Sequence, residues 1–247
     1  MFGRQKVATL LAEFLGTGIL TFAILSVQRS TIGVPFFVAA GAGLALALTT
    51  YILHEASGAH FNPALTLAVW TARRISSVMA VLYIVMQFLG AFLASILYAY
   101  FANTHLQSVG GHYTTRILVA EAVGTLIFTF GVMATVFKKF TLTGVAAFAG
   151  ISYFIGIVVA SAGNAALGLL NPAVALGVHA WVWGTYVLGP VIGALIGVNL
   201  YILFYANNKN ADAVESASAK VSSRSTVVKP KTTAKKPATK KRTTKKK

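Results

Sequence analysis

The chain carries one tripeptide twice, and its residue types suit the start of a helix that presents hydrogen-bond donors. The two copies are Asn62-Pro63-Ala64 and Asn171-Pro172-Ala173. Asparagine is favoured at the N-cap of a helix. Proline is favoured at the first helical position, because its missing N–H would have lacked a partner there anyway. Each copy is therefore predicted to begin a helix.

The helices that follow, at 62–73 and 171–181, are too short to cross a bilayer. Each is about 15 Å long, half of the hydrocarbon thickness. The asparagine oxygen can accept a backbone N–H from Leu65 or Val174, which leaves the amide NH2 donors free. Two half-helices that meet N-terminus to N-terminus near the midplane would surround a shared space with donors and partial positive charge. Such a space repels cations and suits neutral hydrogen-bonding solutes.

A stretch of about six residues precedes each half-helix, at 57–61 and 164–170. Its backbone carbonyls would be unpaired, and lipid tolerates such a backbone only beside water or buried protein. We therefore expect both stretches to be extended and to line the shared space with acceptors. Glu13 and Glu121 are the candidates for holding their N–H groups, because ionisable residues in a spanning helix are costly and usually functional. The alternative is that both glutamates only hydrogen-bond between helices.

The elements that position these residues follow from composition. Of the 247 residues 56% are hydrophobic and 11% charged, and the mean hydropathy is +0.73. This leaves too little polar surface for a soluble globule. Segments long enough to span a bilayer, at roughly 20 apolar residues each, lie at 7–27, 34–53, 78–101, 116–137, 142–161 and 183–205. The sequence predicts an all-α membrane protein with six transmembrane helices and two half-membrane helices.

The predicted orientation follows from the basic residues that flank these spans. Arg4, Lys6, the pairs 73–74 and 138–139, and the C-terminal tail fall on one side, whereas Arg29 and Arg116 fall on the other. Positive charge is enriched in cytoplasmic loops. We therefore expect a multi-pass protein of the cell membrane with both termini in the cytoplasm.

An internal duplication relates the two tripeptides. The run Ala-Glu-x-x-Gly-Thr at 12–17 recurs at 120–125, a shift of 108 residues, and Asn62 recurs as Asn171, a shift of 109. Each copy holds three spans and one half-helix, and an odd number of spans inserts the second copy upside down. The expected organisation is a first repeat at 1–110, an inverted repeat at 111–205 and a tail at 206–247.

The repeated tripeptide, its context Ser-Gly-Ala-His-Phe-Asn-Pro-Ala-Leu-Thr at 57–66, and the two Ala-Glu-x-x-Gly-Thr runs resemble the aquaporin and glycerol-facilitator family, the major intrinsic proteins. The resemblance covers about 1–205. It implies a right-handed six-helix bundle with one pore per subunit, usually a homotetramer, that passes water, glycerol-like polyols, urea or other small neutral molecules. It also implies that the two tripeptides form the central constriction, and that Glu13, Glu121 and His60 brace the loops.

One departure from the family pattern concerns the outer selectivity filter. The family usually has arginine directly after the second tripeptide, where this chain has Val174. Counted back from the asparagines, the other three filter positions fall at Ala42, Val159 and Gly168. All four residues are small and uncharged. Such a filter should be wider and more apolar, so it either admits larger neutral solutes or dewets and conducts poorly.

The tail beyond about 205 has a different composition. It contains most of the 21 lysines and arginines behind the net charge of +16, together with threonine, serine, alanine and proline. Such a segment cannot bury apolar surface and is predicted to be disordered. Its expected partner is anionic lipid at the cytoplasmic face, with nonspecific nucleic-acid binding as the weaker alternative.

Two other functional classes remain open beside a channel. A coupled secondary transporter shares inverted repeats and broken helices, but is expected to show an ion site or paired buried charges. A membrane anchor with a closed pore would act through its tail. The five acidic residues form no dyad and there is no cysteine, so neither an enzyme, nor a cofactor, nor a metal site is expected.

Overall fold

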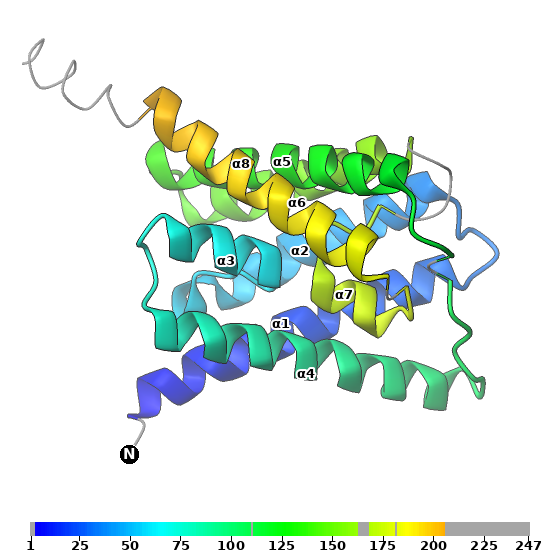
Figure 1. Cartoon of the computed structure of the whole chain (residues 1–247). Coiled ribbons are helices and arrows are strands. Elements are labelled where there is room, and N and C mark those ends of the chain that lie inside the picture. The colour runs from blue at the N-terminus through cyan, green and yellow to red at the C-terminus, as the bar shows by residue number, and fades with distance from the viewer. Residues whose placement is uncertain (1–2, 110, 163–167, 181, 206–247) are drawn as a thin grey trace, which may run out of the picture. The chain divides into compact units, whose positions relative to one another are not determined.

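The computed structural model describes residues 3–109, 111–162, 168–180 and 182–205. Among these residues, six helices are long and apolar enough to cross a membrane. They are α1 (Arg4–Gln28), α2 (Pro35–Ser57), α4 (Ser77–Phe101), α5 (Thr115–Phe137), α6 (Leu142–Ser161) and a last helix made of η1 (Trp183–Leu188) and α8 (Gly189–Tyr205). Two short helices, α3 (Pro63–Thr71) and α7 (Pro172–Gly177), lie between them (Figure 1). The chain is an integral multi-pass membrane protein.

The predicted bounds of these helices hold within a few residues, with two differences. Helix α2 continues to Ser57, beyond the predicted end at 53, and the short helices end at Thr71 and Gly177 rather than at 73 and 181. Gly58 takes a left-handed conformation, φ 85°, and its N–H donates to the carbonyl of His54 at 2.7 Å. This is a helix C-cap that glycine adopts without strain, and it places the end of α2 one residue before Gly58.

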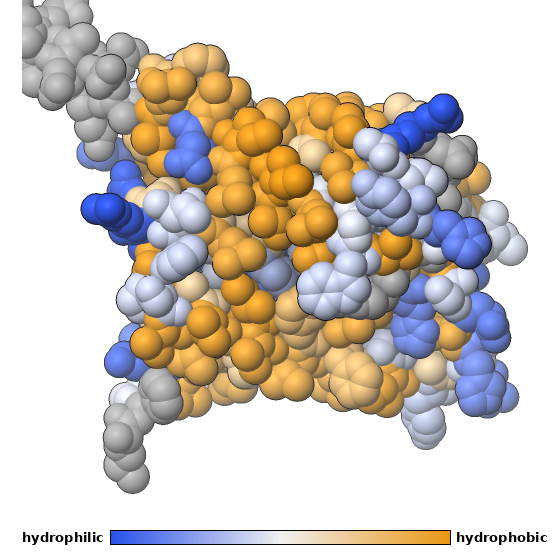
Figure 2. All heavy atoms as spheres, viewed as in Figure 1, coloured by the Kyte–Doolittle hydropathy of each residue, from blue (hydrophilic) through white to orange (hydrophobic). Residues whose placement is uncertain are grey.

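The surface of the bundle is apolar because lipid is its solvent. Large side chains such as Leu44, Ile52, Val78 and Leu203 are more than half exposed, and Figure 2 shows hydrophobic residues across the middle of the visible face, with hydrophilic residues at its two ends. Inside the bundle the helices carry small residues and threonines. With no hydrophobic force between helices in lipid, close packing and hydrogen bonding must hold them together.

Glycines set the closest helix approaches. A Cβ on Gly90 of α4 would lie 2.1 Å from the carbonyl oxygen of Phe14 in α1, and one on Gly193 of α8 would lie 2.0 Å from that of Ala122 in α5. Helices α2 and α6 cross where Gly43 and Gly150 face each other: a Cβ on Gly43 would lie 2.8 Å from the Gly150 oxygen. The same three contacts therefore pack helices within and between the two copies of the duplicated unit.

The burial pattern aligns the two copies helix by helix. Buried positions of α1 recur in α5 at the shift of 108 that relates Glu13 to Glu121, and those of α4 recur in α8 at the shift of 103 that relates Gly90 to Gly193. Between α2 and α6 the shift is 107, the separation of Gly43 and Gly150. The asparagines, by contrast, are 109 residues apart. The second copy therefore has two more residues between its crossing glycine and its asparagine.

The last span differs from its counterpart α4 because of one proline. Pro190 has no N–H to donate to the carbonyl of Tyr186, so the regular i to i−4 ladder cannot run through this turn. The preceding turn, η1, takes the wider π-helical form, which is rare and is often found at functional sites. In α4 the position equivalent to Pro190 is Gln87.

Replacing Gly90 by valine should force α1 and α4 apart. Overpacking a close-packed site costs about 1–3 kcal/mol, and contact with backbone leaves little room for relief. We expect a lower midpoint of thermal denaturation in detergent for Gly90→Val. The control is Gly3→Ala, since nothing lies within 4 Å of a Cβ placed there. Equal midpoints for the two variants would contradict the packing argument.

Candidate pore site

The two asparagines cap the two short helices in the same way. Asn62 Oδ1 accepts from Ala64 N at 2.8 Å and Leu65 N at 3.4 Å, and Asn171 Oδ1 accepts from Ala173 N at 3.0 Å and Val174 N at 3.4 Å. Each proline occupies the first helical position. The caps therefore fix both side-chain amides with their nitrogen atoms turned away from their own helix.

Those nitrogen atoms form a reciprocal pair across the centre of the molecule. Asn62 Nδ2 donates to the carbonyl of Leu170 at 2.8 Å, and Asn171 Nδ2 donates to the carbonyl of Phe61 at 2.8 Å. Each bond thus joins one asparagine to the residue that precedes the other. The expectation that both NH2 groups are free is corrected, since one hydrogen of each is used here. One N–H per asparagine is left for another acceptor.

The stretches that lead into the half-helices are not simply extended, as had been expected. Ala59, Phe61 and Leu170 have positive φ angles of 56°, 47° and 55°. Residues other than glycine take such conformations only where surrounding structure holds them. At Phe61 and Leu170 this geometry accompanies the carbonyls that the asparagines bind. Residues 163–167 of the second stretch lie outside the described part of the chain.

Glu13 accepts four hydrogen bonds, three of them from the first stretch and one from α4. Its Oε1 accepts from Ser57 Oγ at 2.6 Å and His60 N at 3.1 Å. Its Oε2 accepts from Phe61 N and Gln87 Nε2, both at 2.7 Å. The carboxylate is fully buried, and a buried charge is tolerable only when donors surround it. Glu13 therefore acts as the acceptor that fixes the turn before Asn62.

Gln87 and Thr66 extend this network and determine the tautomer of His60. The Thr66 hydroxyl donates to the carbonyl of Asn62 at 2.9 Å and accepts from Gln87 Nε2 at 2.9 Å. Its single hydrogen is then used, so the contact of 3.1 Å between Thr66 Oγ1 and His60 Nδ1 requires the histidine to donate. With the Thr66 hydrogen assigned to the Asn62 carbonyl, His60 carries its hydrogen on Nδ1 and Nε2 is an acceptor.

Glu121 holds the second stretch with fewer bonds. Its two oxygens accept from Leu169 N at 2.9 Å and Leu170 N at 2.8 Å. The equivalent of Gln87 is Pro190, which supplies no side-chain donor. The two carboxylates thus occupy equivalent places but have different numbers of donors among the described residues.

Three polar residues of the site had not been singled out from the sequence. Gln87 bridges Glu13 and Thr66, Tyr83 donates to the carbonyl of Ser57 at 2.7 Å, and Tyr153 donates to the carbonyl of Leu169 at 2.7 Å. The sequence does carry a signal for them, which is a polar side chain inside an apolar span. The same signal indicated the two glutamates, but it was not applied to an amide or a phenol.

The structure separates Val159 from the other expected filter residues. Ala42 and Val174 are fully buried in one apolar cluster, and Gly168 is buried beside α6, where a Cβ on it would lie 2.6 Å from the Ile157 oxygen. The cluster includes four residues of α6, Ala149, Tyr153, Ile157 and Ala160, and Ile157 among them is 1% exposed. Val159 is half-buried and outside it. Two residues turn a helix by about 200°, so Ile157 and Val159 lie on opposite faces of α6. The chain has two more residues between Gly150 and Asn171 than between Gly43 and Asn62.

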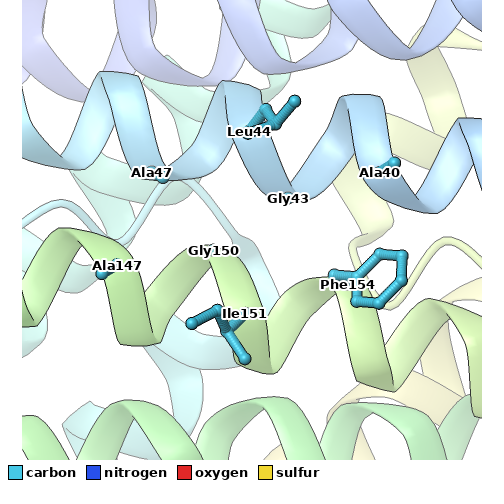
Figure 3. A pocket seen from close by; sticks show the side chains of 8 residues that line it. All are labelled: Ala40, Gly43, Leu44, Ala47, Ala147, Gly150, Ile151 and Phe154. Carbon is cyan, nitrogen blue, oxygen red and sulfur yellow. The ribbon is translucent and has the colours of Figure 1, made fainter.

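One hollow of the described part of the chain does not contain these residues. It is an apolar groove of about 470 Å³ where α2 and α6 cross, lined by Ala40, Gly43, Leu44, Ala47, Ala147, Gly150, Ile151 and Phe154 (Figure 3). Leu44 and Ile151 at the groove are 73% and 56% exposed. It therefore belongs to the outer surface of the bundle rather than to its interior.

The difference between the two carboxylates can be tested by isosteric substitution. Each oxygen of Glu13 accepts two hydrogen bonds, and each oxygen of Glu121 accepts one. The NH2 group of a glutamine cannot accept, so it would face two donors in Glu13→Gln and one donor in Glu121→Gln. A lost bond to a buried charge costs about 1–3 kcal/mol. We expect both variants to denature at lower temperature in detergent than the wild type, and Glu13→Gln to be the less stable of the two. The exposed Glu55→Gln is the control, and the opposite order would contradict the assignment.

Comparison with known proteins agrees with this geometry. The family model described as major intrinsic protein matches residues 4–201. The chain is 32% identical over 230 residues to Nodulin-26 of Glycine max, covering 85% of this chain and 82% of that one. It is 28% identical over 235 residues to the probable aquaporin AqpM of Archaeoglobus fulgidus, covering 81% and 94%.

A third relative and one solved structure extend the comparison. The glycerol uptake facilitator protein-like 6 of Lactiplantibacillus plantarum is 31% identical over 211 residues, covering 75% of this chain and 93% of that one. The aquaglyceroporin structure from Plasmodium falciparum has a TM-score of 0.65 at 21% identity, covering 81% and 95%, which shows a shared fold. The chain belongs to the major intrinsic protein family.

Proposed function

We propose that the chain is a channel through which water and small uncharged solutes diffuse passively, with one pore in each subunit. The observation that carries the proposal is the reciprocal asparagine pair at the N-termini of α3 and α7. This pair joins the starts of the two short helices in the middle of an apolar bundle. Each asparagine keeps one amide N–H that the pair does not use. Helix N-termini oppose cations, and N–H donors replace part of a neutral solute's hydration shell. Relatives named as aquaporins and as a glycerol uptake facilitator support it.

A channel is favoured over a coupled transporter by what the two glutamates do. All four bonds of Glu13 and both bonds of Glu121 go to the stretches that precede the asparagines or to their support. A coupled transporter would need such buried charges for an ion. Here they serve as acceptors for backbone N–H groups, which accounts for them without a coupling ion.

The outer filter in this proposal consists of Ala42, Ile157, Gly168 and Val174. We assign Ile157 rather than Val159 to the set because Ile157 is 1% exposed on the buried face of α6, seven residues after the crossing glycine Gly150, whereas Val159 is half-buried. None of the four carries a hydrogen-bonding side chain. A filter of this kind discriminates by size and by the cost of dehydration, so we assign to the channel solutes larger than water, such as glycerol and urea, in addition to water itself.

Reconstitution into proteoliposomes tests the proposal. Stopped-flow light scattering would compare water efflux with glycerol and urea uptake, against vesicles without protein. We expect fast permeation with little temperature dependence for water and for at least one larger solute. Protein that is well inserted yet gives no excess permeability, with or without residues 206–247, would support the closed-pore anchor instead.

Assembly and placement form the rest of the proposal. The repeats at 1–110 and 111–205 are proposed to sit in the cell membrane with both termini in the cytoplasm, as the basic residues indicate. Four subunits are proposed to associate, as is usual in the family. The groove where α2 and α6 cross supports such an association because Gly43, Ala147 and Gly150 line it, and small residues let a helix of another subunit pack closely in lipid. Size-exclusion chromatography with light scattering would report a tetramer.

Introducing the missing cation should narrow the outer filter. Val174 is fully buried in the first turn of α7, so the guanidinium of Val174→Arg must enter the proposed pore. We expect the ratio of glycerol to water permeability to fall by about tenfold, the size of effect that a misfit in a tight site produces. Val174→Met is the control, since it adds volume without charge. Equal loss of water and glycerol in Val174→Arg would contradict the filter assignment.

The tail 206–247 is proposed to contact anionic lipid. Protein in phosphatidylcholine nanodiscs should co-sediment with vesicles that contain phosphatidylserine and not with neutral vesicles. Each basic residue near such a surface contributes about 1 kcal/mol, and salt should release the protein. A chain ending at Tyr205 is the control. Binding of the full chain to DNA but not to anionic vesicles would favour nucleic acid as the partner.

A further inference from the structure

Two buried threonines of the spanning helices, Thr50 and Thr185, have a hydroxyl without a hydrogen-bond partner among the described residues, and Thr50 lies well inside its span. Buried threonine hydroxyls of the spanning helices donate to the carbonyl four residues earlier at 2.7–2.9 Å, as in Thr17, Thr21, Thr49, Thr125 and Thr129. Thr50 is 2% exposed, and its Oγ1 is buried without a hydrogen-bond partner among the described residues. The carbonyl of Leu46 that it could reach is contacted by Thr49 Oγ1 at 3.2 Å. An orphaned buried hydroxyl costs free energy unless something outside the protein completes it.

The place of Thr50 in the duplicated unit indicates what could complete it. At the shift of 107 that relates α2 to α6, Thr50 is the counterpart of Ile157, the filter residue proposed above. The second copy is inverted, so the two positions are related across the bilayer midplane. Ile157 faces the outer half of the proposed pore, and Thr50 therefore occupies the corresponding place in the cytoplasmic half. Ile157 also shows that the fold itself needs no hydroxyl at this position.

A second unsatisfied polar atom lies one turn further along α2. His54 is four residues after Thr50, and its Nδ1 is buried without a partner among the described residues. Positions four apart lie on one side of a helix, about 6 Å apart along its axis. The counterpart of His54 is Ser161, whose hydroxyl donates to the carbonyl of Ile157 at 2.8 Å and is thus satisfied. At the counterparts of these two positions, Ile157 and Ser161, the second copy has no orphaned polar atom.

We propose that Thr50 and His54 form a hydrogen-bonding site for permeating solute in the cytoplasmic half of the pore, and that this site selects polyols. The inference rests on the proposed channel. A threonine hydroxyl both donates and accepts, and an imidazole nitrogen does one of the two. A solute with several hydroxyl groups can meet both residues at once and so recover the hydration that it loses on entry.

The apolar outer filter makes this site the more important. Ala42, Ile157, Gly168 and Val174 offer no side-chain hydrogen bond, so polar recognition beside the asparagines must come from elsewhere. A water molecule that passes through the pore in single file keeps hydrogen bonds to the water molecules before and behind it. A polyol has to replace several bonds with groups of the wall, so its passage depends on Thr50 and His54 more strongly.

The test is the glycerol to water permeability ratio of three matched variants in proteoliposomes. Thr50→Val keeps the shape and removes the hydroxyl, Thr50→Ser keeps a hydroxyl, and Thr49→Val removes the neighbouring hydroxyl that is already bonded to Ala45. We expect the ratio to fall about threefold or more in Thr50→Val, as the loss of one hydrogen bond implies. It should stay at the wild-type value in Thr50→Ser and Thr49→Val. His54→Leu should change the ratio in the same direction as Thr50→Val.

Water permeability of each variant reports whether the protein is folded and inserted. An unchanged ratio in Thr50→Val, or an equal fall in Thr49→Val, overturns the inference. A wild type that conducts water but no polyol also overturns it, while the proposed channel stands. A wild type that conducts nothing refutes the channel and this site with it. If Thr50→Val does not insert, the glycerol to water permeability ratio of His54→Leu is compared with that of Thr49→Val. A lower ratio in His54→Leu supports the inference, and equal ratios overturn it.

Discussion

The structure depends on one constraint, which is that no backbone polar group may go unsatisfied in a bilayer. The two short helices begin in the middle of the bundle, where lipid cannot supply partners for the residues before them. The reciprocal bonds between each asparagine and the residue before the other meet this need at the junction, and the two glutamates meet it for the N–H groups one or two residues earlier. The positive φ angles of Phe61 and Leu170 can persist because these bonds hold them.

The same constraint explains why the duplicated halves need not be identical. Each half must satisfy the backbone polar groups before its own short helix, but the side chains that do so can differ between the halves. The first uses Gln87, Thr66 and Ser57 around Glu13, whereas the second has Pro190 where Gln87 stands, and a π-helical turn beside it. Helix packing through Gly90 and Gly193 is kept in both halves, because a backbone contact leaves no room for a side chain.

Sequence patterns predicted the spans, the half-helices and their caps because each depends on local chemistry. Apolar length, an Asn-Pro start and a lone buried glutamate can be recognised without neighbours. Gln87 and Tyr83 could not be placed in this way, since their roles arise only when α4 packs beside the stretch before Asn62. Nor could the sequence show that each asparagine gives one hydrogen to the opposite chain segment, which is a contact between residues 108 or more positions apart.

The two extra residues between Gly150 and Asn171 have a consequence for comparing family members. A relative without these two residues, aligned with this chain on the asparagines, would match it in the loop but would differ by more than half a helical turn about which side chain of α6 faces inward. Aligned on the crossing glycine, they agree about the face. Filter residues of relatives can therefore be compared correctly only when each helix is aligned on its crossing glycine and each loop is aligned on its asparagine motif. Substrate preferences inferred from those residues depend on this choice.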